Sequence, residues 1–177
     1  TGTMSNSVHT YGVGKNLSKN IFTRVGYVFS GWALSTSGSV KYKDGENVRN
    51  LTTGTNDIIL YAKWTANKYE VKYNANGGTG TMSNSKFTYD KDANLSTNTF
   101  TRKDYTFEGW STSKDGSVVY LDNQSVKNLT SGTNVVNLYE VRKKKVNTDV
   151  TIIIKVENGI SSPSSRVVAK GNNSMFT

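Results

Sequence analysis

The sequence predicts a mainly β protein, α+β at most, built from small modules in tandem. Its composition is the first reason: one Pro, 16 Gly and 11% aromatic residues stand among abundant Asn, Ser and Thr. This composition is typical of short strands joined by polar turns. The second reason is internal repetition, because the stretch TGTMSNS at residues 1–7 returns at residues 79–85.

The repetition extends over a whole unit. Shifted by 78 positions, the chain aligns on itself without a gap, and about 35 of 64 aligned residues are identical, which indicates a tandem array. We therefore expect three parts: a first repeat at 1–64 that lacks its N-terminal strand, a second and complete repeat at 65–142, and a linker with the start of a different β-module at 143–177.

The strands of the second repeat are predicted from their alternation. Tyr69, Val71 and Tyr73 alternate with charged residues, a period of two that indicates one buried face. The segment NANGG at 74–78 then turns the chain, since glycine tolerates positive φ. Further strands are expected at 85–90, 105–110, 116–121 and 134–141.

Two short segments are the candidates for helix. Val48 and Leu51 lie three residues apart within 44–51, and the same spacing recurs within 122–129. One helical turn per repeat, docked on a mixed sheet, is the expectation.

These residues together resemble a known family. The segment NANGG, the block YTFEGW at 105–110, the block DGSVVY at 115–120 and the closing LYAKW at 60–64 are similar to the Listeria–Bacteroides repeat, also called the internalin B-repeat. The resemblance covers residues 1–142. It implies a small β-grasp-like module carried in tandem on bacterial surface proteins, outside the cell at the surface or in the wall.

Two departures from that pattern fall in the second repeat. It ends LYEVR at 138–142, so the terminal Trp is lost, and Asp104 stands where the first repeat has Gly26. Both departures suggest the last unit of an array, where the outer face meets something different.

Candidate catalytic, cofactor-binding and metal-binding residues are not found. His9 is the single histidine and there is no cysteine, which disfavours a Ser-His-Asp triad, thiol catalysis and cysteine-ligated zinc. The stretch DKDAN at 90–94 opens like a calcium loop, but Leu95 and Thr101 occupy the positions that need Gly and a carboxylate. The glycines of 76–81 are not followed by Lys-Ser/Thr, so a hairpin turn explains them better than a phosphate loop.

The aromatic residues have two readings. They could form a stacking platform for sugar rings, or they could supply the core that a domain of about 70 residues needs. Their positions on the alternating faces of predicted strands favour the core. The residues concerned are Trp32, Trp64, Trp110, Tyr27, Tyr61, Tyr105 and Tyr139.

The charge suggests an anionic partner as an alternative to an ordinary basic surface. The net charge is +9, and the only true cluster is RKKK at 142–145. A host or cell-wall anionic polymer would fit this charge, whereas nucleic acid and membrane insertion are not expected. No stretch approaches the ~20 apolar residues of a membrane span.

The leading hypothesis is a non-catalytic tandem repeat of a bacterial cell-surface protein, acting as stalk or spacer and as an adhesion or protein-interaction module. Repetition extends a stalk or multiplies weak contacts. The alternative is a module that binds carbohydrate, glycosaminoglycan or anionic wall polymer. An enzyme is the least favoured reading, since no acid–base constellation recurs in both repeats.

The missing first strand predicts one further property. The first repeat would have an open sheet edge, and unpaired backbone groups attract a strand. One expectation is weak self-association, with the alternating segment 149–156 as the best donor strand; the alternative is that the source protein continues upstream and that order begins at the first residues here.

Overall fold

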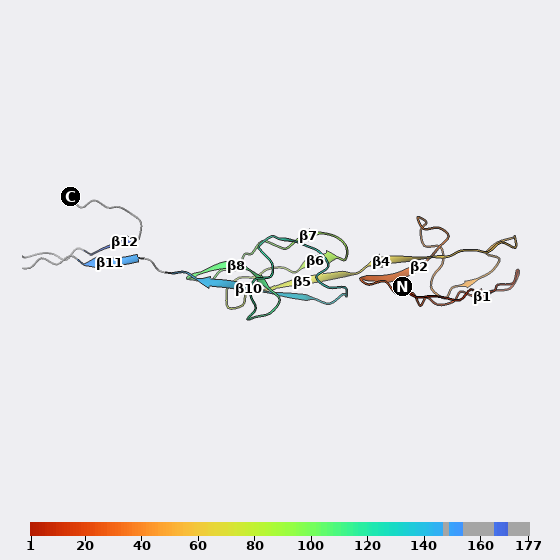
Figure 1. Ribbon diagram of the computed structural model, residues 1–177, viewed down its shortest axis with the longest axis horizontal. Coiled ribbons are helices and arrows are strands. Elements are labelled where there is room, and N and C mark those ends of the chain that lie inside the picture. Colours follow the sequence, from red (N-terminus) through yellow and green to blue (C-terminus); the bar gives the residue numbers. More distant parts are fainter. Residues whose placement is uncertain (147–148, 154–164, 170–177) are drawn as a thin grey trace, which may run out of the picture.

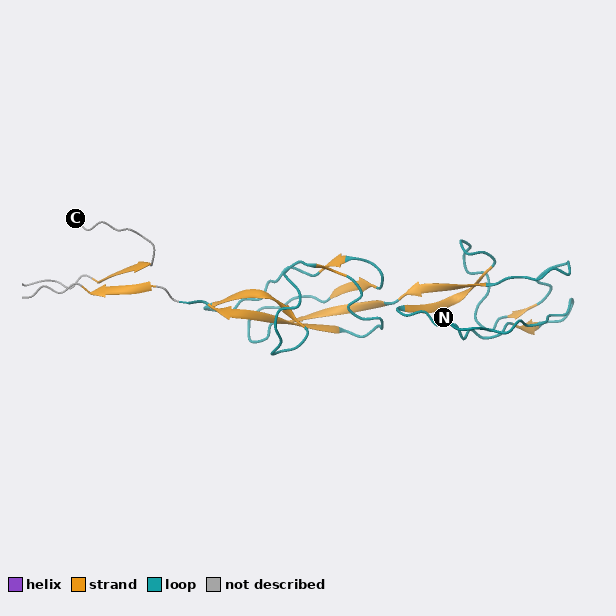
Figure 2. Cartoon of the chain, viewed as in Figure 1, coloured by secondary structure: helices purple, strands orange, loops and turns teal. Residues whose placement is uncertain are grey.

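The computed structural model describes residues 1–146, 149–153 and 165–169. Throughout these residues every regular element is a strand, as Figure 2 shows. The strands are β1 (Lys15–Asn16), β2 (Tyr27–Ala33), β3 (Asn47–Val48), β4 (Tyr61–Ala66), β5 (Lys68–Asn74), β6 (Ser85–Thr88), β7 (Ala93–Asn94), β8 (Tyr105–Ser111), β9 (Ser125–Val126), β10 (Val136–Lys144), β11 (Asp149–Ile153) and β12 (Ser165–Ala169).

The second repeat is built on a four-stranded mixed sheet. Its strand order is β6-β5-β10-β8. β5 pairs antiparallel with β6 and parallel with β10, and β10 pairs antiparallel with β8 across an irregularity between Val141 and Arg142. β5 is therefore a central strand, and it holds the two ends of the repeat together.

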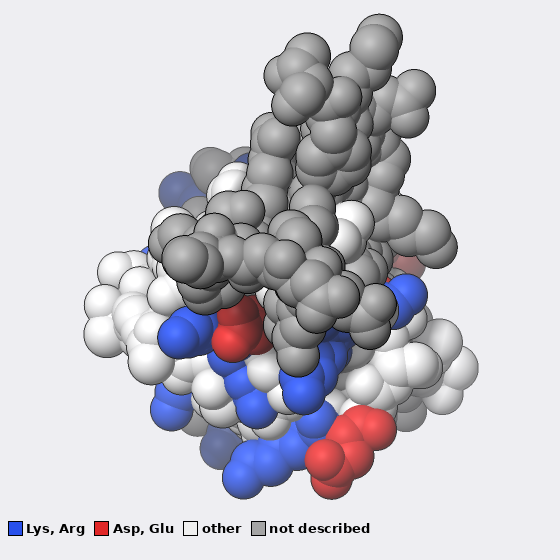
Figure 3. All heavy atoms as spheres, turned by 90° about the vertical axis from the view of Figure 1, so that its left-hand side faces the viewer, with Lys and Arg blue, Asp and Glu red and all other residues white. Residues whose placement is uncertain are grey.

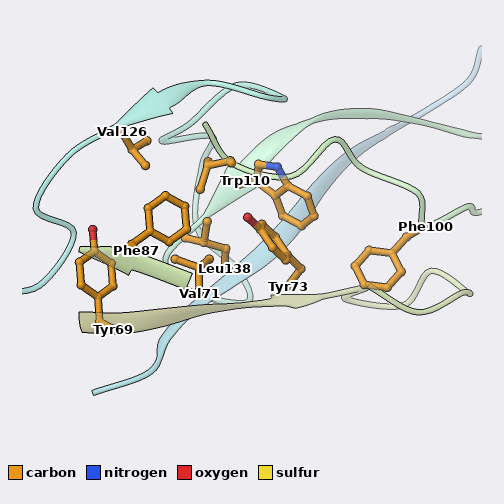
Figure 4. Packing of buried hydrophobic residues seen from close by; sticks show 9 residues of the cluster. Tyr69, Val71, Tyr73, Phe87, Phe100, Trp110, Val126 and Leu138 are labelled. Carbon is orange, nitrogen blue, oxygen red and sulfur yellow. The ribbon is translucent and has the colours of Figure 1, made fainter. Parts of the chain in front are cut away.

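The core of the second repeat lies on one face of this sheet. The alternation predicted for β5 is confirmed, since Tyr69, Val71 and Tyr73 are all buried. Figure 4 shows Tyr69 beside Phe87, Val71 beside Leu138 and Tyr73 beside Trp110. Trp110 is 0% exposed and packs against Tyr73 with 4.9 Å between ring centroids. Burial of both Trp32 and Trp110 in the core is thus confirmed.

The first repeat has less sheet and a smaller core. β2 pairs with β4, and β1 pairs with β3. Its buried cluster consists of Leu17, Trp32 and Val48. Residues 7–10, which align with β6, form no strand. No described strand of the first repeat pairs with them.

The helix predictions are wrong. The segment 44–51 contains β3, and the segment 122–129 contains β9, which pairs with β7. Asn123 and Asn128 have positive φ values of 52° and 55°, which a right-handed helix does not accommodate. The spacing of Val126 and Leu129 reflects an extended strand and the turn after it. Without such a helix in the described residues, the β-grasp arrangement is not confirmed.

The strand predicted at 116–121 is also wrong as a regular element. Only Tyr120 forms a bridge, to Trp110, and a single Trp32–Tyr42 bridge is its counterpart in the first repeat. Gly109, which precedes Trp110, has φ 154°, and a Cβ at this position would clash with the carbonyl oxygen of Tyr120. The chain therefore crosses the strand at one point instead of running along it.

The tail contains two paired strands. β11 pairs antiparallel with β12, so the described part of the expected donor segment is already paired within its own region. Residues 154–156 of that segment, and the turn expected at Asn158–Gly159, lie outside the described residues.

Candidate functional site

The junction between the two repeats is a polar arrangement that connects distant parts of the described chain. β4 runs into β5 through a single residue, Asn67 (Figure 1). The amide of Asn67 donates to the carbonyl of Gly26 at 2.8 Å, and its carbonyl accepts from the amide of Tyr89 at 2.8 Å. Its side-chain amide donates to the carbonyl of Ser131 at 2.7 Å. This linker residue is therefore held from both repeats at once.

Side chains add a second layer to the junction. The rings of Tyr27 and Tyr89 meet edge to face at 5.8 Å between centroids. The Tyr27 hydroxyl donates to Asp90 Oδ2 at 2.8 Å, and the Arg24 guanidinium lies over the Tyr27 ring at 3.8 Å from its centroid. Asn128 donates to Asp90 Oδ1 at 2.8 Å and so orients the carboxylate. The turn of the first repeat between Arg24 and Tyr27, which we call the outgoing turn, thus packs against the face of the second repeat that carries Tyr89 and Asp90.

The pKa values of the central pair follow from these hydrogen bonds. The hydrogen bonds from Asn128 and then from Tyr27 lower the pKa of Asp90 below its ordinary 3.8. The hydrogen bond to Asp90 raises the pKa of Tyr27 above its ordinary 10.0. Each shift favours the protonation state in which hydroxyl and carboxylate are paired.

We therefore expect a defined pH window for the junction. The Asp90 contribution is fully present above pH 3.8 and is lost as the pH falls through its lowered pKa. The Tyr27 contribution is fully present below pH 10.0 and is lost as the pH rises through its raised pKa. The integrity of the junction can be measured through nuclear Overhauser contacts between the Tyr27 and Tyr89 rings, recorded from acid to alkaline pH. Asp90→Asn is the matched control and should abolish the acid limb; an unchanged acid limb would contradict the assignment.

The outgoing end of the second repeat differs from that of the first. Lys103, Lys143, Lys144 and Lys145 replace Val25, Thr65, Ala66 and Asn67 of the aligned first repeat. All four lysines are exposed, as is Arg102. β8 begins and β10 ends at this edge, and Figure 3, which faces that end of the molecule, shows Lys and Arg gathered there. We call these five residues the basic end.

The second departure at this end is a buried ion pair. Arg142 stands where the first repeat has Trp64, and Glu140 where it has Ala62. Glu140 is 2% exposed, its Oε2 accepts from Arg142 Nε at 2.6 Å, and Arg142 Nη2 also donates to the carbonyl of Phe100 at 2.9 Å. The ion pair between Glu140 and Arg142 therefore takes the place of Ala62 and Trp64 of the first repeat.

The surface of the second repeat also carries an open groove. It encloses about 500 Å³ between the β5 turn and β10, with Met82, Phe100, Lys114 and Tyr139 among its lining residues. Of the aromatic residues considered for a sugar platform, Trp32 and Trp110 are buried. Trp64, Tyr27, Tyr61, Tyr105 and Tyr139 are half-buried. No single exposed aromatic row is formed by them in the described chain.

The polar residues singled out in the sequence have structural partners. His9 Nε2 lies 3.0 Å from Ser7 Oγ. Asp92 of DKDAN lies 3.7 Å from Lys127 Nζ, and Asp90 belongs to the junction. Among the described residues no three His, Cys, Asp or Glu side chains are grouped to hold a metal ion, and no helix there is long and apolar enough to cross a membrane.

Sequence reasoning missed the junction. Asn67, Tyr89 and Asp90 carry it; Asn67 and Tyr89 were not selected as functional residues, and Asp90 was considered only as the opening of a calcium loop. Asp90 aligns with Gly12, and this difference between repeats was the available signal. Its meaning depends on which residues the neighbouring repeat brings near, and the alignment does not contain that information.

Comparison with known proteins agrees with this architecture. The family model of the Listeria-Bacteroides repeat domain matches residues 1–63 and 69–139. The chain belongs to the Listeria-Bacteroides repeat family. Repeats of this family in tandem are typical of bacterial surface proteins and usually non-catalytic.

Two relatives come from Evansella cellulosilytica. One, named "Putative Gly-rich membrane protein", is 32% identical over 123 residues, which are 66% of this chain and 14% of the relative. The other, named "Putative membrane protein", is 37% identical over 65 residues, 34% of this chain and 10% of the relative. The chain thus spans only a small part of these relatives. No solved structure matches it.

Proposed function

We propose that the two repeats form a stalk or spacer of a bacterial cell-surface protein that also presents adhesion or protein-interaction surfaces, and that they act without catalysis. The junction is the observation that carries this proposal. Asn67 is the one residue between β4 and β5, and it is bonded to both repeats. A linker of this kind transmits orientation, whereas a Gly/Ser-rich linker behaves as a random coil.

A spacer must hold whatever lies beyond it at a distance. The experiment displays the 177-residue chain on a bacterial surface between an anchor and a fluorescent tag and measures the height of the tag above the wall. The matched variant replaces Asn67 by a flexible Gly-Ser linker. We expect the mean height to fall and its spread to rise in the variant. Equal heights in both chains would contradict the spacer role.

The basic end favours a second candidate function, binding of an anionic polymer. Five Lys and Arg side chains lie at one edge, and the aligned turn between Arg102 and Tyr105 contains one carboxylate, Asp104. Lysines attract phosphate or sulfate groups as point charges, and such attraction is screened by salt. A host glycosaminoglycan or a wall polymer would provide the repeated negative charge.

Binding of heparin and of poly(glycerol phosphate) tests this second function. We expect Lys143→Ser, Lys144→Ser and Lys145→Ser together to weaken binding at physiological salt by at least tenfold. The control changes the same number of exposed lysines in the first repeat: Lys19, Lys41 and Lys43. An equal loss in both triple variants would indicate only a general effect of net charge and would contradict a site at the basic end.

A further inference from the structure

We infer that the residue at the position of Gly26 decides whether a following repeat can pack against the end of a repeat. Gly leaves room for the tyrosine ring of the following repeat (the follower), whereas the side chain of the aligned Asp104 occupies that space. Gly26 has φ 77° and lies against the Tyr89 ring of the second repeat. A Cβ built on Gly26 would overlap three atoms of that ring. Contact between residue 26 and the Tyr89 ring therefore requires a residue without a side chain, and not only one that tolerates positive φ.

The second repeat retains the Arg–Tyr contact and the backbone hydrogen bond of this outgoing turn. Arg102 lies over the Tyr105 ring at 4.0 Å, as Arg24 lies over Tyr27 at 3.8 Å. The amide of Lys145 donates to the carbonyl of Asp104 at 2.7 Å, as Asn67 donates to Gly26 at 2.8 Å.

The backbone of the turn is also the same. Asp104 has φ 62°, close to that of Gly26, and Asp is among the residues that tolerate this left-handed region. The Asp104 side chain thus starts where a follower's tyrosine would lie. Its charge would also oppose a follower that carried the equivalent of Asp90.

The partner that fits an outgoing turn with Gly is consequently another repeat of this family, presented by its tyrosine face. The first repeat displays such a face, since Tyr11, which aligns with Tyr89, is 67% exposed. Its supporting contact is retained as well: the amide of Gly12 donates to Asn50 Oδ1, as that of Asp90 donates to Asn128 Oδ1. The inference concerns the order of repeats and holds whether or not they act as spacers.

Distance measurement between two spin labels tests the inference. The chain has no cysteine, so Ser37→Cys and Thr112→Cys, both exposed, give one label in each repeat. We expect a narrow distance distribution for the parent chain and a broad one for Gly26→Asp. We expect the Tyr89→Ala chain to give a broad distribution as well, and in that background Gly26→Asp should add no further breadth. A Gly26→Asp chain as narrow as the parent would overturn the inference.

A second chain keeps the test decisive if Gly26→Asp unfolds the first repeat. Residues 67–144 are inserted once more after Lys144, and the labels are placed at Thr112 and at its copy. With Asp104 we expect a broad distribution between these two repeats, and with Asp104→Gly a narrow one. Equal distributions in the two chains would overturn the inference.

Discussion

Replacing Trp110 by alanine should lower the free energy of unfolding of the second repeat by about 3–5 kcal/mol, the usual cost of truncating a fully buried aromatic side chain. Trp110 is 0% exposed and contacts Tyr73, Phe100 and Phe107, with ring centroids 4.9, 6.4 and 5.1 Å away. A cavity of this size touches β5, β8 and the segment between them. For a small domain the loss is a large part of the total stability.

Urea unfolding followed by far-ultraviolet circular dichroism measures the loss. Trp64→Ala is the matched control, because Trp64 is only half-buried and contacts Phe29 at one edge, with centroids 5.6 Å apart. We expect a clearly smaller loss there, and the transition of the second repeat should not move. A Trp110→Ala loss under about 1 kcal/mol would contradict the core assignment and favour an exposed ring.

The parts of the fold that could be predicted from the sequence are those with a local signal. The alternation of Tyr69, Val71 and Tyr73 indicates a strand with one buried face. The repeat of 78 residues is visible directly as identity between the two units. The spacing of Val126 and Leu129 was ambiguous. Positive φ at Asn123 and Asn128 and pairing with β7 excluded a helix, and neither can be read from a three-residue period.

The candidate site was less predictable for a different reason. Asp104 was recognised as a departure from Gly26, yet its consequence follows only from the position of Tyr89, which another repeat supplies. Likewise the loss of Trp at position 142 was visible, but its replacement by an ion pair was not. Glu140 and Arg142 are separated by one residue, and in a regular strand both would simply lie on one face.

The ion pair gives the second large expected effect. Arg142→Trp alone restores the residue of the first repeat but leaves Glu140 with no partner. An uncompensated charge in a buried position typically costs about 3–5 kcal/mol. We therefore expect this single substitution to destabilise the second repeat strongly, although it returns the sequence toward the family pattern. Urea unfolding of the second repeat measures the loss.

The double variant Glu140→Ala with Arg142→Trp should recover most of that loss. It reproduces Ala62 and Trp64, and the new indole would face Phe107 as Trp64 faces Phe29 in the first repeat. Replacing both members of a buried ion pair by apolar residues of suitable shape is often neutral or stabilising. The two positions should thus show a coupling energy of several kcal/mol, since contacting residues depart from additivity. A double variant as unstable as Arg142→Trp alone would show that the second repeat does not accept the first repeat's packing, and would contradict the exchange of an aromatic contact for an ion pair.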